Sequence, residues 1–299
     1  MRTLEALLKE GTGLLREAGI EDAALDAWLL LEFITGKSRA WFFAHGEEKA
    51  GEELCRQYHR LIMTRAERIP LQHLTHQAYF MGYELYVDEN VLIPRQDTEI
   101  LAEEALKVLK TKKNPRILDM CTGSGCILLS ILAEREDVSG VGADISPKAL
   151  EVAKRNADSL KVEKRAEFVE SDIFCASFFR QKDGKVPEKY DMLISNPPYI
   201  ATGELDCLME EVRLHDPVTA LDGREDGLYF YRRITQQAGD YLKPGGMLAY
   251  EIGCSQGKEV SAIMESAGFD EVKVLQDLAG LDRVVTGLWN KEQETDKIM

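Results

Sequence analysis

The chain has 299 residues, of which 44% are hydrophobic and 30% are charged, and its formal net charge is −15. This length allows one large domain, or one large domain with a smaller one. No apolar run approaches the roughly 20 residues of a membrane span, and the first residues lack the layout of a signal peptide, so we expect a cytoplasmic protein. The acidic balance argues against binding to naked nucleic acid, because proteins that neutralise phosphates need a basic surface.

Residues 1 to about 70 carry apolar side chains at helical spacing. Two apolar stripes are visible, formed by Leu4, Leu7, Leu8, Leu14 and Leu15 and by Ala24, Ala27, Trp28, Leu31 and Ile34. A third helix is expected over residues 51–69, closed by Pro70. No polar constellation stands out in this region. We therefore expect residues 1–74 to form a small helical bundle that recognises a partner.

Residues 77–93 alternate in polarity and are rich in aromatic and β-branched side chains. Turn signals occur at Met81-Gly82 and at residues 88–90. This pattern predicts a β-hairpin linker over residues 75–97. The remaining chain is assigned to a catalytic domain over residues 98–290 and a polar tail over 291–299.

Beyond the linker, short apolar segments alternate with helical ones. The expected strands are residues 116–120, 140–144, 166–170, 191–195, 247–252, 271–275 and 283–288, and the clearest helices are 127–134, 147–160, 227–241 and 256–267. Such alternation is typical of an α/β fold with a doubly wound, mainly parallel sheet. Residues 276–282 are too few for a crossover helix, so the last two strands form an antiparallel pair. A seven-stranded sheet with its last strand antiparallel resembles the class I methyltransferases.

A glycine-rich segment, Asp119 to Gly125, lies where the first of these strands turns into a helix. Glycines there let the backbone approach a ligand closely. Asp144 ends the second strand, where a carboxylate can accept both ribose hydroxyls. Asp172 follows the third strand, where a carboxylate can accept from an adenine amino group while Ile173 packs on the ring. Either aspartate alone is a common turn residue. Together, at the ends of successive strands, they predict a binding site for a nucleoside that lies across the edge of the sheet.

One residue of this segment departs from the usual pattern Asp-x-Gly-x-Gly-x-Gly. Cys121 occupies the first glycine position. Either this position does not need a positive φ, or the loop is altered. We expect Cys121 to be a small buried side chain rather than a nucleophile. The six cysteines and five histidines show neither CxxC nor HxxxH spacing, so reduced thiols and no metal site are expected.

The fourth strand is followed by Ser195-Asn196-Pro197-Pro198-Tyr199-Ile200. Two consecutive prolines fix φ and remove two N–H donors, which leaves rigid carbonyl groups. The side-chain oxygen of Asn196 and the backbone oxygen of Pro197 can accept the two hydrogens of an NH2 group, while Tyr199 offers a flat face to a planar amide or base. Fixed acceptors align the nitrogen lone pair with a sulfonium methyl and stabilise the developing positive charge.

These motifs together resemble the HemK/PrmC family over nearly the whole chain. Further matching segments are Pro70-Leu-Gln-His, Val91-Leu-Ile-Pro-Arg-Gln-Asp-Thr-Glu99, Glu211-Val-Arg-Leu-His-Asp-Pro217, Ala220-Leu-Asp-Gly-Arg-Glu-Asp-Gly-Leu228, Glu251-Ile-Gly-Cys-Ser-Gln256 and Asp277-Leu-Ala-Gly-Leu-Asp-Arg283. Two further departures are Gln96, where the family often has proline, and His76, where it usually has glycine.

The resemblance implies methyl transfer from S-adenosyl-L-methionine, leaving S-adenosyl-L-homocysteine, to the side-chain N5 of the glutamine in the Gly-Gly-Gln motif of class 1 peptide-chain release factors. It implies a protein substrate, no direct nucleic acid, no membrane and a monomer. The implied cofactor contacts are Cys121, Thr122, Gly123, Ser124, Gly125, Asp144, Asp172, Ile173 and Asn196. The implied substrate contacts are Asn196, Pro197, Pro198 and Tyr199, with Asn196, Pro197 and Tyr199 as catalytic residues. Arg95, Glu251 and Arg283 are expected to tie the linker and loops to the site.

Two alternatives remain open at this point. Enzymes that methylate exocyclic amines of DNA or RNA bases share the Asn-Pro-Pro-Tyr arrangement, although they must extract a base from its stack and usually carry a basic groove. A helical adaptor fused to a sheet that only senses the cofactor is the non-enzymatic alternative. The acidic charge disfavours the first, and the retained carboxylates and Asn-Pro-Pro-Tyr segment disfavour the second.

Overall fold

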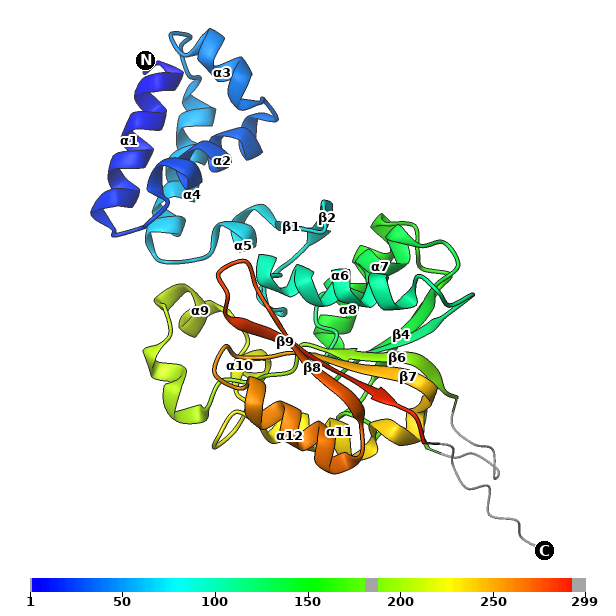
Figure 1. Ribbon diagram of the computed structural model, residues 1–299. Helices are drawn as coiled ribbons and strands as arrows, with labels where there is room; N and C mark the ends of the chain where they lie inside the picture. Colours follow the sequence, from blue (N-terminus) through cyan, green and yellow to red (C-terminus); the bar gives the residue numbers. More distant parts are fainter. Residues whose placement is uncertain (1, 181–187, 292–299) are drawn as a thin grey trace, which may run out of the picture. The chain divides into compact units, whose positions relative to one another are not determined.

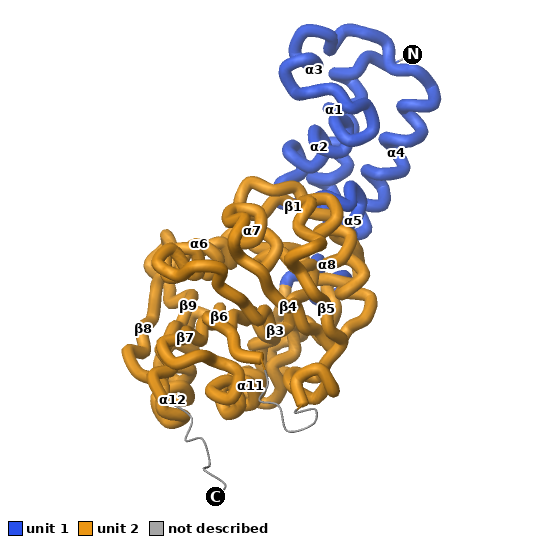
Figure 2. The backbone as a smooth tube through the Cα atoms, turned by 90° about the vertical axis from the view of Figure 1, so that its right-hand side faces the viewer, with its two compact units in different colours: residues 1–77, 209–215 blue, residues 78–208, 216–299 orange. Residues whose placement is uncertain are grey.

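The computed structural model describes residues 2–180 and 188–291, which form two compact units (Figures 1 and 2). The first unit comprises residues 1–77 together with 209–215, and the second comprises residues 78–208 and 216–299. The chain thus leaves the second unit after residue 208 and returns to it at residue 216. The predicted polar tail, residues 291–299, lies outside the described residues except for Lys291.

The first unit is helical, and the expected N-terminal bundle is confirmed. Its helices are α1 (Leu4–Glu17), α2 (Ala23–Thr35), α3 (Arg39–His45), α4 (Glu52–Ala66), α5 (Leu71–Thr75) and α9 (Glu210–His215). Leu7, Leu15 and Leu31 are among the side chains buried in one apolar cluster. Helices α1 and α4 approach closely because Gly11 has no side chain, and a Cβ there would lie 2.5 Å from the Tyr58 hydroxyl oxygen. That hydroxyl donates to the backbone oxygen of Ala27 on α2, at 3.0 Å.

Helix α9 belongs to the first unit through a group of ion pairs. Arg65 of α4 places Nε 2.7 Å from Oδ2 of Asp26, and both side chains are buried. The same guanidinium has Nη1 3.5 Å from Oε1 of Glu211, and Nη1 of Arg68 lies 3.1 Å from that oxygen. Nε of Arg68 also lies 3.5 Å from Oε2 of Glu210, so two arginines are paired with three carboxylates and the buried charges of Arg65 and Asp26 are compensated.

The expected hairpin is present as β1 (Gln77–Phe80) and β2 (Tyr83–Tyr86). Its turn is Met81-Gly82, with φ angles of 52° and 79°. Two consecutive residues of positive φ are the geometry of a type I′ turn, which matches the twist of paired strands.

The second unit is built on a seven-stranded sheet in the order β5-β4-β3-β6-β7-β9-β8. The strands are β3 (Arg116–Met120), β4 (Ser139–Asp144), β5 (Ala166–Glu170), β6 (Tyr190–Ser195), β7 (Leu242–Glu251), β8 (Asp270–Gln276) and β9 (Asp282–Trp289). Strand β9 lies between β7 and β8 and is antiparallel to both, whereas β3 to β7 are parallel. This arrangement confirms the class I methyltransferase fold. Each predicted strand is found with its ends shifted by at most one residue, except that β7 begins at Leu242 and not at residue 247.

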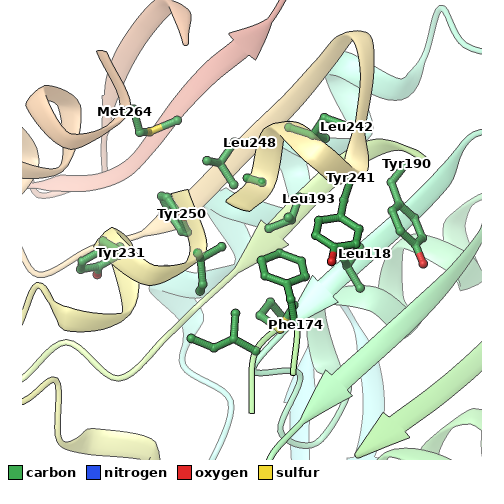
Figure 3. Close-up of a cluster of buried hydrophobic side chains, with 14 of the residues drawn as sticks. Leu118, Phe174, Tyr190, Leu193, Tyr231, Tyr241, Leu242, Leu248, Tyr250 and Met264 are labelled. Atoms are coloured by element: carbon green, nitrogen blue, oxygen red, sulfur yellow. The ribbon is translucent and has the colours of Figure 1, made fainter. Parts of the chain in front are cut away.

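Alternating side chains of the central strands bury two faces of this sheet. Met192 and Ile194 pack with helices α6 (Glu99–Leu109), α7 (Cys126–Glu134) and α8 (Pro147–Ser159). Leu193 and Leu248 point to the other face, against α11 (Tyr229–Tyr241) and α12 (Gly257–Ala267), in the aromatic-rich cluster of Figure 3. The remaining elements are η1 (Gln96–Thr98), η2 (Thr202–Cys207) and α10 (Val218–Leu221). Because both faces of the sheet are buried, the sequences of the central strands are nearly continuous runs of apolar residues.

Candidate active site

A cavity of about 310 Å³ opens at the carboxyl ends of the parallel strands in the second unit. Parallel register aligns these ends, because Met120 of β3 pairs with Ala143 of β4 on one side and with Ser195 of β6 on the other. The loops that follow the strands therefore meet at one edge, which is where open α/β sheets bind ligands. The cavity is lined by segments 90–98, 120–127, 144–149, 171–173, 196–198, 217–224 and 229–233.

The loop after β3, residues 119–125, is called the cofactor loop here. Thr122 donates from its hydroxyl to Oδ2 of the buried Asp119, at 2.6 Å, and the amide of Gly125 donates to the Thr122 carbonyl at 2.8 Å. Gly125 has φ 78°, and a Cβ there would lie 2.7 Å from Cδ1 of Leu129. This position therefore requires glycine for both conformation and space.

Cys121 adopts φ 61°, so the first glycine position of the motif does have a left-handed backbone. The hypothesis that this position needs no positive φ is therefore wrong, and the cysteine accepts a conformation that costs a non-glycine residue roughly 1–2 kcal/mol. Burial raises the pKa of the Cys121 thiol far above its usual range. A protonated thiol is a poor nucleophile. His76, the other departure from glycine, also has a positive φ, 55°.

Asp144 ends β4 and holds the cofactor loop through its carboxylate. Oδ2 accepts from the amide of Gly123 and Oδ1 from the amide of Ser146, each at 2.9 Å. Burial raises the pKa of this carboxyl, while these two amide donors oppose the shift. Each oxygen keeps a further lone pair for a ligand hydroxyl. Asp144 lines the cavity.

Asp172 also lines the cavity, but its carboxylate is already paired. Nη1 and Nη2 of Arg233 donate to its Oδ1 and Oδ2 at 2.9 and 3.2 Å. A carboxylate has about four acceptor positions, so this bidentate pair leaves room for one more donor. The neighbouring Ile173 has φ 53°, unusual for a β-branched residue, and its carbonyl accepts from the Ser171 hydroxyl at 2.6 Å.

The loop after β6, residues 195–200, is called the clamp loop here. The hydroxyl of Ser195 donates to the Met120 carbonyl at 2.5 Å, which fixes the loop to β3. Nδ2 of Asn196 donates to the hydroxyl of the buried Thr98, at 3.5 Å. Asn196 and Pro198 line the cavity, whereas Pro197 and Tyr199 are not among its lining residues.

The far end of the clamp loop rests on glycines and on one glutamine. Nε2 of Gln256 donates to the Tyr199 carbonyl at 3.0 Å. A Cβ on Gly227 would lie 2.3 Å from that same carbonyl oxygen, and a Cβ on Gly223 would lie 2.8 Å from Cα of Tyr199. The amide of Gly223 donates to the Ile200 carbonyl at 2.7 Å. The glycines of the segment 220–228 are thus required by close approach of the clamp loop.

Two arginines join other segments to this edge of the sheet. Nη2 of Arg95 lies 2.8 Å from Oδ2 of Asp216, and Arg95 lines the cavity. Nη2 of Arg283 lies 3.0 Å from Oδ2 of Asp277 and 3.4 Å from Oδ2 of Asp97. Gln96 begins η1 and is exposed, a helix-start position where proline is equally acceptable.

Three contributors to the site were missed by sequence reasoning. Thr98, Arg233 and the segment 217–224 all line the cavity. Thr98 and residues 220–228 lie within segments that match the family, but the sequence pattern assigned them no function. Arg233 carries no signal, because it is one of several charged residues on an amphipathic helix.

The described side chains contain no group of three or more His, Cys, Asp or Glu residues that could hold a metal ion. Within residues 2–180 and 188–291, no helix combines the length and the apolar composition that a bilayer crossing requires.

Residues 6–75 match the family model described as PrmC N-terminal domain, and residues 97–222 match the model described as Methyltransferase small domain. The release factor glutamine methyltransferase of Clostridium acetobutylicum is 39% identical over 95% of this chain and 98% of its own length. That of Caulobacter vibrioides is 38% identical over 92% of this chain and 93% of its own. This chain belongs to the release factor glutamine methyltransferase family.

A solved structure supports the fold of this family member independently of sequence. The hMettl16 catalytic domain, in complex with a 3'UTR hairpin, has a TM-score of 0.56 at 14% identity, and covers 77% of this chain and 82% of the other. At such low identity the likeness concerns the fold alone. The methyltransferase sheet described above is therefore shared with a protein of very different sequence.

Proposed function

We propose that this protein transfers the methyl group of S-adenosyl-L-methionine to the side-chain N5 of the glutamine in the Gly-Gly-Gln motif of class 1 release factors. The observation that carries the proposal is one cavity lined both by the cofactor loop with Asp144 and by Asn196 and Pro198 of the clamp loop. Membership of the family supports the choice of a protein glutamine over other planar nitrogens. The net charge of −15 supports it as well, since a nucleic-acid substrate favours a basic surface.

The residues present fit the cofactor. Asp144 retains acceptor capacity for two ribose hydroxyls, and Asp172 retains capacity for an adenine amino group. Cys121 to Ser124 and Ile173 line the cavity beside them. When bound, S-adenosyl-L-methionine supplies an electrophilic methyl group on a sulfonium.

An amide nitrogen is a weak nucleophile, and the clamp loop would compensate by orienting it and stabilising its developing charge. Asn196 Oδ1 and the Pro197 carbonyl would accept the two hydrogens of the substrate NH2, which directs the nitrogen lone pair away from them. Prolines at 197 and 198 leave no amide hydrogen there that could compete for these oxygens. Preorganised acceptors stabilise positive charge as it develops on nitrogen, and the proton is lost to water afterwards. No general base has to ionise the amide first.

The direct test is incubation of the protein with methyl-labelled S-adenosyl-L-methionine and either a class 1 release factor or its Gly-Gly-Ala variant. We expect label on the glutamine-containing factor only. Equal labelling of the variant, or labelling of DNA or RNA instead, would overturn the proposal.

A second test concerns the clamp. Asn196→Ala should lower kcat by about 100- to 1,000-fold, the loss typical of removing one preorganised hydrogen-bonding group. Cofactor affinity, measured by calorimetry, should fall far less than kcat, because Asn196 is one of several implied cofactor contacts and the cofactor loop and Asp144 are untouched. Unchanged turnover in this variant would contradict the assigned role.

A further inference from the structure

Glu251 is a buried carboxyl next to the clamp loop. It ends β7, where its Cα pairs with that of Val284 on β9, and its side chain is only 2% exposed. Its backbone carbonyl accepts from the Tyr231 hydroxyl at 2.9 Å, which fixes the end of the strand. Oε2 is buried and has no hydrogen-bond partner among the described residues. A carboxyl kept in such a place without a full set of partners costs stability, so it calls for a functional explanation.

The side chains of Thr98 and Asn196 are among the groups around Glu251 that favour its ionised form and so lower the pKa of this carboxyl. Nδ2 of Asn196 also lies 3.5 Å from the Thr98 hydroxyl oxygen. The NH2 end of the Asn196 carboxamide therefore lies toward Thr98, on the side where Glu251 interacts with both residues. A carboxylate can only accept, so it selects the NH2 end of the carboxamide and rejects its oxygen.

We propose that Glu251, together with Thr98, is a positioning residue that holds the Asn196 carboxamide with Oδ1 available to the substrate amide. An unrestrained carboxamide presents either NH2 or oxygen to a ligand. Only the oxygen can accept from the substrate nitrogen. This inference rests on the proposed function, because it assigns a partner to the clamp residue of that reaction.

The charge of Glu251 adds a second effect. A carboxamide that donates to a carboxylate is polarised, and its oxygen becomes a stronger acceptor for a nitrogen on which positive charge develops. Burial raises the pKa of Glu251 to about 7. The titratable and charged groups that face it are Asp97 of η1, Cys126 of α7, Tyr199 of the clamp loop, Tyr231 of α11 and Arg283 of β9. Of these, Arg283 favours the ionised carboxyl and Asp97 disfavours it.

The first experiment compares Glu251→Gln and Glu251→Ala in the full-length enzyme. An introduced glutamine keeps an acceptor but no charge, so kcat should fall about tenfold, the difference between a charge-assisted and a neutral hydrogen bond. Glu251→Ala removes the acceptor too, and kcat should fall about 100-fold. KM for both substrates should stay within about twofold of wild type, since ground-state contacts are untouched. Glu259→Gln, an exposed residue of α12, is the matched control.

The pH profile distinguishes this role from simple packing. In the wild type, kcat should decline as pH falls through about 7, because protonation of Glu251 removes the charge behind Asn196. The Glu251→Gln variant should lack this decline. Wild-type kcat in Glu251→Gln, or a decline of kcat with the same midpoint in both proteins, would overturn the inference.

A reversal of the hydrogen bond gives a test that does not depend on loss of activity. Asn196→Asp places two acceptors opposite each other and should be almost inactive. Adding Glu251→Gln supplies an NH2 group that can donate to the introduced aspartate, and kcat should recover at least about tenfold over the single variant. A double variant no better than Asn196→Asp would count against the assigned pairing. Circular dichroism and cofactor binding verify that each variant is folded.

A failure of the positioning role of Glu251 can be distinguished from a failure of the proposed substrate. Failure of the wild type to label the release-factor glutamine contradicts the proposed substrate. The Glu251 comparison is then made on whichever nitrogen the wild type labels, and equal rates for wild type and Glu251→Gln contradict the positioning role alone.

Discussion

The cofactor loop and the clamp loop follow neighbouring strands and face the same cavity, yet they are held in different ways. The cofactor loop is held mainly from within, by Thr122 on Asp119 and by glycine geometry at Gly125, with Asp144 as its partner from the next strand. The clamp loop is held from distant parts of the sequence. Its supports come from β3, from η1, from residues 221–227 and from residues 251–256.

The difference follows from what each loop does. Binding a cofactor needs backbone that approaches closely, and a short motif can encode that. Directing one amide oxygen at a weak nucleophile needs side-chain orientation to be fixed, and this takes a shell of supporting residues. We therefore expect changes around the clamp loop to lower turnover, and changes around the cofactor loop to lower cofactor affinity.

The largest effect outside the clamp residues themselves is expected at Gly227. Gly227→Ala forces a Cβ to within 2.3 Å of the Tyr199 carbonyl oxygen at a φ of 72°, so the clamp loop must shift. A displacement of about 1 Å from reactive geometry can cost about 100-fold in kcat. Cofactor affinity should stay near that of the wild type.

Gly203→Ala is the matched control, because a Cβ there meets no atom within 4 Å and φ is not positive. Steady-state kinetics and calorimetry on both variants provide the measurement. A Gly227→Ala enzyme with normal kcat and weakened cofactor binding would reverse the comparison between the two loops.

The opposite pattern is expected at Asp144. Asp144→Asn removes the charge that assists hydrogen bonds to a ribose, and cofactor Kd should rise about 10- to 100-fold. At saturating cofactor kcat should fall by no more than about threefold, since the clamp loop is unchanged. Calorimetry with S-adenosyl-L-homocysteine tests the affinity. Loss of kcat without loss of affinity would show that the two loops are not separable in this way.

The cofactor loop is easier to predict from the sequence than the supports of the clamp loop. The sheet and the positions of Asp144 and the clamp tetrapeptide follow from alternating apolar segments and local motifs. The contacts of Thr98 and Gly227 with the clamp loop, and the pairing of Arg233 with Asp172, do not. These contacts join residues that are 28 to 98 positions apart in the sequence. Only the folded sheet brings them together, and no periodicity encodes them.

Ionisation of the buried Glu251 is expected to lower the free energy of unfolding. The pKa of Glu251 is about 7 in the folded protein against about 4.5 for an ordinary glutamate. A raised folded pKa means that the contribution to stability is fully present below about pH 4.5 and is lost as pH rises through 7. At pH 8 the loss is on the order of 3 kcal/mol.

Glu251→Gln should therefore be less stable than, or equal to, the wild type at pH 5 and more stable at pH 8. Urea unfolding of both proteins across this range gives the measurement. Parallel pH dependences of the two free energies of unfolding would mean that Glu251 ionises without cost in the folded protein. Asp119, whose pKa burial also raises to about 7, remains in both proteins and cancels in the comparison.

The smallest effect is expected within the cofactor loop. Cys121→Gly removes the strain of a cysteine with a left-handed backbone, but it also raises the conformational entropy of the unfolded chain. The free energy of unfolding should therefore rise by only about 0.5 kcal/mol. Cys121→Val should lower it by about 1–2 kcal/mol, because a β-branched residue tolerates φ 61° worst. Thermal unfolding of both variants is the measurement. A glycine variant less stable than the valine variant would indicate that side-chain packing, not backbone strain, decides this position.

The inclusion of residues 209–215 in the helical unit bears on how such enzymes can be recombined. A graft of residues 1–77 onto another methyltransferase would carry Arg65 and Arg68 without Glu211, the carboxylate that both contact. The donor module is discontinuous in the gene, and its short second piece lies between the clamp loop and α10. We therefore expect a working chimera to need both pieces exchanged together.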